Sequence, residues 1–324
     1  YKSFIEFFSA LEYSFIMWKD LLPEKTSYLC SGCKTCDGTV CINQLPGWGG
    51  INSNRNFILN YSSWEEIQIP EQDIVNAGLP EIALAPMTGM VQNAGLKDEK
   101  QGYFTLVESA ANAGIKLSIG DGEPDYKLEY GIEALKTLGK KAAVFIKPYE
   151  NHELKKRIGK SLSIAECIGI DIDAWEIKTM KNSSSMPAAM EKKNHSKLKE
   201  IKSFLPPEIP FVIKGVADQE TLNMILELKP FAAVVSNHGG RVSAPEKGTA
   251  YILSDFAGKL LEAGIQVWVD GGLRTKEHLL KASALGASRV LIGRPFLQGA
   301  ICLGKEGIKT VLNQDFGFSI PETN

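Results

Sequence analysis

Short apolar runs rich in β-branched residues recur along the chain, and segments with helical spacing of apolar residues separate them. We interpret the runs as eight strands, which begin at Glu81, Ile115, Lys141, Cys167, Pro210, Phe231, Gln266 and Arg289. The helical patterns between them cover residues 105–113, 126–138, 153–165, 220–228, 253–263 and 276–285. Glycines follow several of these patterns, at Gly114, Gly139, Gly264 and Gly286, where we expect left-handed helix caps. This alternation indicates parallel strands joined by crossover helices.

The even spacing of these units decides between two α/β folds. A doubly wound sheet can also hold eight strands, but regular spacing is more typical of a closed (β/α)8 TIM barrel. We therefore predict a barrel of residues 81–324, preceded by an N-terminal extension of residues 1–80 that packs on it. Apolar residues at helical spacing in residues 4–18 favour a docked helix over contact with a partner or a membrane surface. Residues 175–194 and 242–249 are expected to form mobile loops.

Charge and hydropathy exclude some partners. The 324 residues carry 36 lysines and arginines against 38 acidic residues, so no basic excess is available to neutralise a nucleic-acid backbone. No apolar stretch reaches the roughly 18 residues that a membrane span requires. The most apolar segment, residues 4–22, is interrupted by charges and does not resemble a signal peptide. We expect a cytoplasmic protein that spans no membrane and binds no nucleic acid.

Polar residues gather where the predicted strands end. They are Thr88, Asp121, Lys147, Tyr149, Asp171, Asp173, Lys214, His238, Arg241, Asp270 and Arg294. In a barrel the carboxyl ends of all strands lie on one face, which is where the active sites of such barrels are found. Some of the charges, with Lys116, Asp171 and Asp173 as candidates, could instead form ion pairs in the barrel.

Two kinds of site follow from these strand ends. His238 and Arg241 lie three residues apart in the glycine-rich loop Ser236-Asn237-His238-Gly239-Gly240-Arg241, which places a base and a permanent cation near one small acid. The last two strand ends carry Gly271, Gly272, Gly293, Arg274 and Arg294, where backbone amides and guanidinium groups can bind a phosphate. A phosphate-bearing ligand, such as a cofactor, is therefore expected there.

These motifs carry a family resemblance. Ile213-Lys214-Gly215-Val216, the loop from Ser236 to Arg241, Asp270-Gly271-Gly272 with Arg274, and Ile292-Gly293-Arg294-Pro295 resemble the FMN-dependent α-hydroxy acid oxidases and dehydrogenases. This family is typified by glycolate oxidase, lactate oxidase and flavocytochrome b2. The resemblance is strong over the last 115 residues or so, fair from Glu81 to Ala174, and absent over the first 75 or so.

The resemblance implies a role for each matching residue. His238 would take a proton from the substrate, Arg241 would bind its carboxylate, Tyr149 would contact it, and Asp171 would orient the histidine. Lys214 would lie by the N1/O2 edge of the flavin. The implied flavin-binding residues are Pro86, Met87, Thr88, Gly120, Lys147, Lys214, Ser236, Asp270, Gly271, Gly272, Arg274, Gly293 and Arg294. The implied reaction is hydride transfer from a small 2-hydroxy acid to flavin N5, by a homo-oligomer that passes electrons to an unidentified acceptor.

The chain also departs from the family pattern. Lys147 stands where the family has a glutamine, and the second arginine expected after strand four is missing, with only Lys178 nearby. Two alternatives therefore stay open: an FMN-dependent isomerase resembling type 2 isopentenyl diphosphate isomerase, and a flavin- or metal-binding protein without catalytic activity. The His238 and Arg241 pair argues against the isomerase.

The N-terminal extension contains a cysteine cluster, Cys30-x2-Cys33-x2-Cys36-x4-Cys41. Thiolates at this spacing can converge on one zinc ion or one iron-sulfur cluster. Disulfide bonds formed by these cysteines are the third possibility. Because Cys167 and Cys302 are expected to be buried and unpaired, and nothing suggests export, a metal centre is favoured over disulfides.

Overall fold

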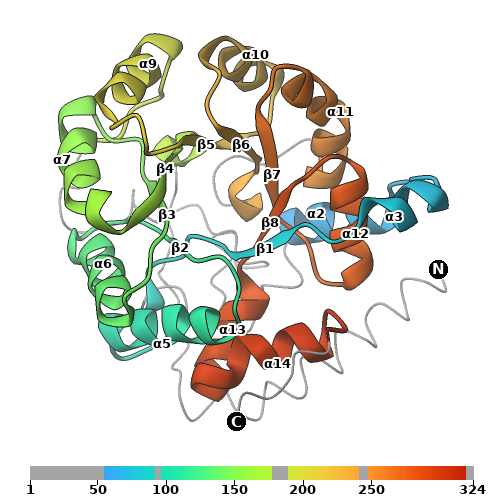
Figure 1. Ribbon diagram of the computed structural model, residues 1–324, viewed down its shortest axis with the longest axis horizontal. Coiled ribbons are helices and arrows are strands. Elements are labelled where there is room, and N and C mark those ends of the chain that lie inside the picture. The colour runs from blue at the N-terminus through green and yellow to red at the C-terminus, as the bar shows by residue number, and fades with distance from the viewer. Residues whose placement is uncertain (1–54, 92–95, 177–188, 241–246, 319–324) are drawn as a thin grey trace.

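Eight parallel strands and the helices around them form a (β/α)8 barrel in the computed structural model, which describes residues 55–91, 96–176, 189–240 and 247–318 (Figure 1). The strands pair in the order β1-β8-β7-β6-β5-β4-β3-β2. A parallel bridge between Ala83 and Lys116 closes the ring, and Lys116 donates its backbone N–H to Ile82 and accepts one from Leu84. The predicted TIM barrel is confirmed.

Each observed strand lies within or next to a predicted run. The strands are β1 (Glu81–Leu84), β2 (Ser118–Ile119), β3 (Ala142–Ile146), β4 (Ala165–Asp171), β5 (Phe211–Val216), β6 (Ala232–Val235), β7 (Gln266–Asp270) and β8 (Arg289–Ile292). The helices that follow them are α5 (Glu99–Asn112), α6 (Tyr126–Leu138), α7 (Asn151–Ser161), α9 (His195–Phe204), α10 (Gln219–Leu228), α11 (Thr249–Glu262), α12 (Lys276–Ala284), α13 (Arg294–Leu303) and α14 (Gly307–Gln314). The glycines expected at helix ends have positive φ, with values of 72° at Gly114, 61° at Gly139, 75° at Gly264 and 101° at Gly286.

The helical patterns named from the sequence leave out α9, α13 and α14, as well as the helices at residues 55–66 and 71–77. Helix α9 was not predicted, because only Leu198 and Ile201 on it are buried and its other positions are mostly polar. Asn194 caps this helix by accepting the backbone N–H of Lys197. The helix predicted to continue to Ala165 ends earlier, since a 3-10 turn, η1 (Leu162–Ile164), leads into β4 at Ala165.

The barrel has separate inner and outer cores. The outer core lies between strands and helices, and alternate strand residues build the inner one, mostly with small side chains. The large inner side chains are Phe145 and Trp268, which are 2% and 1% exposed. Gly169 makes room for the first, because a Cβ at this position would lie 2.4 Å from the Phe145 ring. These side chains fill the interior of the barrel below its mouth, so a ligand must bind at the carboxyl ends of the strands.

Two helices precede the barrel, α2 (Arg55–Glu66) and α3 (Glu71–Ala77) (Figure 1). Helix α2 packs against α11, α12 and the turn at residues 238–240, and α3 packs against α12. The Trp64 indole donates to the Gly271 carbonyl at 2.8 Å, and the Lys281 ammonium donates to the Trp64 carbonyl at 2.9 Å. The expected docked helix in residues 4–18, and most of both expected loops, lie outside the described residues. Within the described part, no helix is both long and apolar enough to cross a bilayer.

Candidate active site

Strand alternation brings a row of polar side chains to the barrel mouth. Lys147, Asp171, Lys214, Ser236 and Asp270 continue the inward-facing rows of β3 to β7, at the carboxyl end of each strand. All five are buried. They come from separate strands, yet ion pairs and hydrogen bonds connect most of them. The structure therefore brings together Lys147, Asp171, Lys214 and Asp270, four of the residues that the sequence placed at the strand ends.

Asp171 is the centre of an ion cluster. Its Oδ2 accepts from the Lys147 ammonium at 2.8 Å, and its Oδ1 accepts from the Lys214 ammonium at 3.0 Å. Lys214 also lies 3.5 Å from Oδ2 of Asp270. Burial opposes ionisation of Asp171, but His238, Lys147 and Lys214 together hold the pKa of its carboxyl well below its ordinary value. Burial alone would lower the pKa of Lys214, yet the Asp171, Asp270 and Asp173 carboxylates raise it above its ordinary value.

His238 begins a short 3-10 turn, η3 (His238–Gly240), directly after β6. Its backbone φ is 56°, a left-handed conformation that is uncommon for residues other than glycine. The Ser236 hydroxyl oxygen supports this turn by accepting the His238 backbone N–H at 3.1 Å. Strained backbone that is held in place by its surroundings often occurs at functional sites. The turn aims the imidazole across the mouth toward the end of β4.

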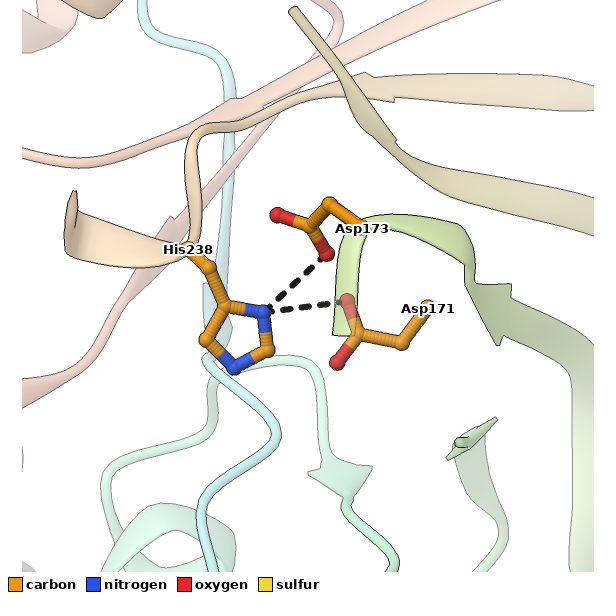
Figure 2. Close-up of side chains that lie close together, drawn as sticks. All are labelled: Asp171, Asp173 and His238. Atoms are coloured by element: carbon orange, nitrogen blue, oxygen red, sulfur yellow. Dashed lines mark hydrogen bonds and ion pairs between the residues drawn. The ribbon is translucent and has the colours of Figure 1, made fainter. Parts of the chain in front are cut away.

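Two carboxylates meet one nitrogen of this imidazole (Figure 2). Nδ1 of His238 lies 3.2 Å from Oδ1 of Asp173 and 3.4 Å from Oδ1 of Asp171. Asp173 belongs to the turn η2 (Ile172–Glu176) that follows β4. Burial raises the pKa of Asp173 above its ordinary value, His238 works against this, and the neighbouring Asp171 carboxylate adds to it. The two aspartates thus differ in their electrostatic environments, although both face the same ring.

The same three side chains have ligand atoms within 4.8 Å of one another, a spacing that a metal ion could bridge. Both carboxylate oxygens of Asp171, however, already accept hydrogen bonds from ammonium groups. A cation placed there would compete with Lys147 and Lys214 for the same oxygens. We therefore interpret the cluster as a histidine held by carboxylates rather than as a metal centre.

Tyr149 lies after β3 and is fully buried, and its hydroxyl has no hydrogen-bond partner among the described residues. The Arg157 guanidinium covers the ring, 4.2 Å from its centroid. Arg157 is 1% exposed; Asp121 accepts from it at 2.7 Å, and Glu123 and Glu153 accept at 2.9 Å each. Since Asp121 also accepts the Lys147 backbone N–H, this network ties α7 to the ends of β2 and β3. The network thereby fixes Arg157 against the Tyr149 ring.

The ends of β7 and β8 have features suited to a polyol phosphate. Asp270 keeps one buried carboxylate oxygen, Oδ1, without a partner among the described residues. Arg294 is the first residue of α13, where helix N–H groups lack helical acceptors. Its guanidinium donates to the Gly239 carbonyl at 3.2 Å, which places it beside the turn that holds His238.

Both positions directly after β7 require glycine. Gly271 and Gly272 have φ values of 92° and 80°, which glycine adopts without strain. A Cβ at Gly272 would lie 2.6 Å from the Asn60 backbone, so this glycine also permits close packing of α2. Arg274 follows them and donates to the Leu273 carbonyl at 2.8 Å. Burial lowers the pKa of Arg274 to about 10. The electrostatic effects of Tyr61 and Asp315 raise this pKa, but they are weaker than the effect of burial.

The ends of β1 and β2 complete the described rim. Pro86, Met87 and Thr88 follow β1, and a Cβ at Gly120 would lie 3.1 Å from the Pro86 backbone, so the two strand ends are in close contact. The sulfur of Met87 lies near Gly293 after β8, at 3.4 Å from the position of a Cβ there. Lys116, by contrast, precedes β2 and lies 3.7 Å from Glu81 at the opposite end of the barrel.

Several predicted residues cannot be placed. Arg241 and Lys178 lie outside the described residues, and so does the cysteine cluster, Cys30, Cys33, Cys36 and Cys41. The sequence reasoning missed other residues that the structure brings to the site. Arg157 lies on a helix and Asn60 in the extension, so neither carried a signal. Asp173 is different, because the sequence already places it with Asp171 at this strand end as a candidate for an ion pair, and the structure adds its contact with His238.

Comparisons with known proteins agree with this geometry. The sequence profile of the FMN-dependent dehydrogenase family matches residues 141–314, more than half of the 324-residue chain. The chain is 34% identical to rat (Rattus norvegicus) 2-hydroxyacid oxidase 2 over 147 residues, which cover 44% of this chain and 40% of that protein. It is 38% identical to the L-lactate oxidase of Lactobacillus jensenii over 106 residues, which cover 33% of this chain and 26% of that protein. These alignments span less than half the length of either relative.

Solved structures share the fold. The flavin-binding domain of baker's yeast flavocytochrome b2 superposes with a TM-score of 0.61 at 19% identity, covering 81% of this chain and 74% of that one. Mandelate oxidase with (S)-2-phenylpropionate gives 0.60 at 20% identity, covering 80% and 81%. At such low identity the superpositions bear on the fold alone.

Proposed function

The chain belongs to the FMN-dependent dehydrogenase family, and we propose that it oxidises a small 2-hydroxy acid to the corresponding 2-oxo acid with FMN as the oxidant. The observation that carries the proposal is the orientation of His238. Carboxylates face its Nδ1, so Nε2 points away from them and is directed to take up a proton (Figure 2). A base held in this way suits the oxidation of a hydroxyl-bearing carbon.

The described residues fit FMN. Oδ1 of Asp270, which has no partner within the described part of the chain, is an acceptor suited to a hydroxyl of the ribityl chain. Arg294 and the start of α13 are suited to its phosphate. Lys214 supplies a buried ammonium that is suited to the flavin ring, and Lys147 places a second one on the same aspartate. FMN would supply a two-electron acceptor for the hydrogen on the substrate carbon.

The protein groups would then act on the substrate as follows. Nε2 of His238 takes the proton of the 2-hydroxyl while Nδ1–H stays bonded to the carboxylates. The carbon-bound hydrogen leaves with the electron pair, which gives the 2-oxo acid. The Tyr149 hydroxyl, for which the described residues offer no hydrogen-bond partner, would donate to a substrate oxygen. Arg241, three positions after the histidine, would bind the substrate carboxylate through two parallel hydrogen bonds.

Three further features stay proposals. The spacing of Cys30, Cys33, Cys36 and Cys41 supports one metal centre, either zinc or iron-sulfur. The family resemblance supports a homo-oligomer. A cytoplasmic location is supported by the buried Cys167 thiol, which forms no disulfide within the described residues.

The proposed activity is tested by adding glycolate, L-lactate or L-mandelate to the FMN-loaded protein without oxygen. We expect one or more of these acids to bleach the flavin absorbance near-stoichiometrically and to yield the 2-oxo acid. Simple carboxylates without a 2-hydroxyl, such as propionate, serve as controls and should leave the absorbance unchanged. Flavin that binds but stays oxidised with every 2-hydroxy acid would instead favour the isomerase or the non-catalytic flavoprotein.

A further inference from the structure

We propose that Lys147 is a second cation at the flavin ring, which adds to Lys214 and shifts the bound FMN toward its reduced, more negatively charged form. This role rests on the proposed function, because it requires FMN at the barrel mouth. The family pattern has a neutral glutamine where Lys147 stands, so the added charge belongs to this chain.

Three neighbouring strands present charges of alternating sign at the mouth. The pairing of β4 with β5 sets Asp171 beside Lys214. The pairing of β3 with β4 ends at Ile146 and Ile170, so Lys147 is the next residue of β3 and lies beside Asp171. The Asp171 carboxylate accepts from the Lys147 ammonium at 2.8 Å and from the Lys214 ammonium at 3.0 Å. One carboxylate thus lies between two cations.

Lys147 is the less neutralised of the two cations. The Lys214 ammonium has a second carboxylate nearby, because it lies 3.5 Å from Oδ2 of Asp270. Among the described residues, the Lys147 ammonium forms an ion pair with Asp171 alone. The Lys147 side chain is also the more exposed, at 11% against 4% for Lys214. Its charge is therefore the more available to a ligand in the mouth.

Asp121, a further carboxylate close to Lys147, is engaged elsewhere. Its Oδ1 accepts from the Arg157 guanidinium at 2.7 Å and from the Gly122 backbone N–H at 2.8 Å. Its Oδ2 accepts the backbone N–H of Lys147 at 3.3 Å, not the ammonium. Asp121 thus fixes the backbone at the end of β3, while its own charge is paired with Arg157.

The order of the strands around the barrel leads a flavin to these lysines. The neighbouring strands β8 and β7 end at Arg294, suited to the phosphate, and at Asp270, suited to the ribityl chain. A ligand that begins at β8 and continues past β7 extends toward β5 and β3, where Lys214 and Lys147 lie. Because side chains fill the barrel interior, the ring has to stay at the level of these strand ends.

A cation beside the ring has a defined effect on electron transfer. Two-electron reduction increases the negative charge of the ring, so the cation attracts the reduced form more strongly than the oxidised form. This attraction is greater in the poorly solvated mouth than it would be in water. Lys147 should therefore raise the reduction potential of the bound flavin. A higher potential favours removal of the hydrogen and its electron pair from the substrate carbon.

The test is the two-electron reduction potential of the FMN-loaded protein, measured against a reference dye during chemical reduction. Lys147→Gln removes the charge but keeps a hydrogen-bond donor, and it should weaken binding of reduced relative to oxidised FMN by at least about tenfold. That change corresponds to a potential lower by about 30 mV. Lys147→Met, which also removes the donor, should lower the potential at least as much. Asp171 keeps Lys214 as its counter-ion in both variants, so both should fold.

Lys116→Gln is the matched control, because it removes a lysine charge at the opposite end of the barrel, and it should leave the potential unchanged. A wild-type potential in Lys147→Gln would overturn the proposal. A fall in Lys147→Met alone would also overturn it, since the hydrogen bond rather than the charge would then act on the ring. A higher half-saturating substrate concentration in Lys147→Gln, with no change in potential, would place the ammonium on the substrate instead.

Chemical reduction requires no hydroxy acid, which separates this inference from the proposed activity. If no hydroxy acid reduces the wild type, the proposed activity fails, while the potentials still decide the role of Lys147. If the wild type binds no FMN, both the proposed function and this role of Lys147 are refuted.

Discussion

Asn60 and Asn237 exchange two side-chain amide hydrogen bonds, of 2.9 and 2.7 Å, although 177 residues separate them in the sequence. Asn60 also accepts the Thr249 backbone N–H at 3.1 Å, and both asparagines are buried. This contact fastens helix α2 to the residue directly before His238. A helix ahead of the barrel thereby supports the turn that carries the proposed base.

Asn60→Ala should therefore weaken both the fold and the site. Loss of the amide leaves Asn237 and the Thr249 N–H unsatisfied, which should lower the free energy of unfolding by about 2 kcal/mol. Asn76→Ala, on the exposed side of α3, is the matched control and should have little effect. Urea unfolding of the two variants measures the difference. Equal stability of both variants would show that the paired amides do not secure α2.

Two arginines at opposite ends of β8 give a controlled test of the phosphate site. Arg294→Ala should weaken FMN binding by roughly 30- to 100-fold, because it removes charge-assisted hydrogen bonds. Arg289, at the start of the strand, pairs with Glu81 and stacks on Trp268 at 4.1 Å. Arg289→Ala should leave the FMN affinity of the folded protein unchanged. Fluorescence titration of apoprotein with FMN measures both, and similar affinities in the two variants would place the phosphate elsewhere.

Replacement of the two aspartates at the end of β4 should affect stability differently at neutral pH. Asp171→Asn leaves two buried lysines without their counter-ion and should lower the free energy of unfolding by about 3 kcal/mol. Asp173→Asn removes a buried carboxylate, one oxygen of which has no partner among the described residues, and should leave stability unchanged or increase it. Chemical unfolding of the FMN-free proteins at pH 7 measures both changes. A larger loss in Asp173→Asn than in Asp171→Asn would contradict this assignment.

The difference in stability between Asp173→Asn and the wild type should change with pH in a defined direction. The pKa of Asp173 is raised in the folded chain, above the ordinary 3.8, so the unfolded chain releases this proton at the lower pH. The stability contributed by the protonated carboxyl is complete below about pH 3.8 and is lost as the pH rises through the raised pKa. The Asp173→Asn variant has no carboxyl group at this position, so it does not lose this stability as the pH rises. Its stability relative to the wild type should therefore increase with pH from about pH 4 upward.

The cysteine cluster makes a separate prediction. Four thiolates from Cys30 to Cys41 should bind one metal centre, so anaerobically prepared protein should contain close to one equivalent of zinc or the iron of one cluster. Replacement of Cys33 by Ser should remove most of that metal, whereas Cys167→Ser, in the barrel, should not. Less than about a tenth of an equivalent of either metal, with four titratable thiols in the segment, would show merely reduced cysteines.

The barrel could be predicted from sequence because local patterns encode it. Each strand is a short apolar run, each helix has its own period, and the strand-end residues Lys147, Asp171, Lys214 and Asp270 follow from strand alternation. Once the fold is known, their common location at the mouth follows as well. The positions of these residues are encoded locally at the strand ends, which is why the sequence could place them at the mouth.

The missing parts depend on contacts between distant residues. Asn60 meets Asn237 only after α2 docks, and Arg157 collects its carboxylates from another strand end and its own helix. Neither Asn60 nor Arg157 belongs to a periodic pattern or a motif that would predict its contacts. The competition between Asp171 and Asp173 for His238 depends on which oxygen each lysine occupies. Such geometry can be read only from three-dimensional coordinates.

The measurement that tests the central claim most directly is the single-turnover rate of flavin bleaching without oxygen, in wild type and in His238→Asn. Asparagine tolerates the positive φ at this position, so the variant should keep its backbone and its FMN. We predict bleaching by L-lactate or glycolate in the wild type, a fall of at least about 100-fold in His238→Asn, and no change in His152→Asn, whose side chain is 79% exposed. A His238→Asn rate equal to that of the wild type would contradict the account.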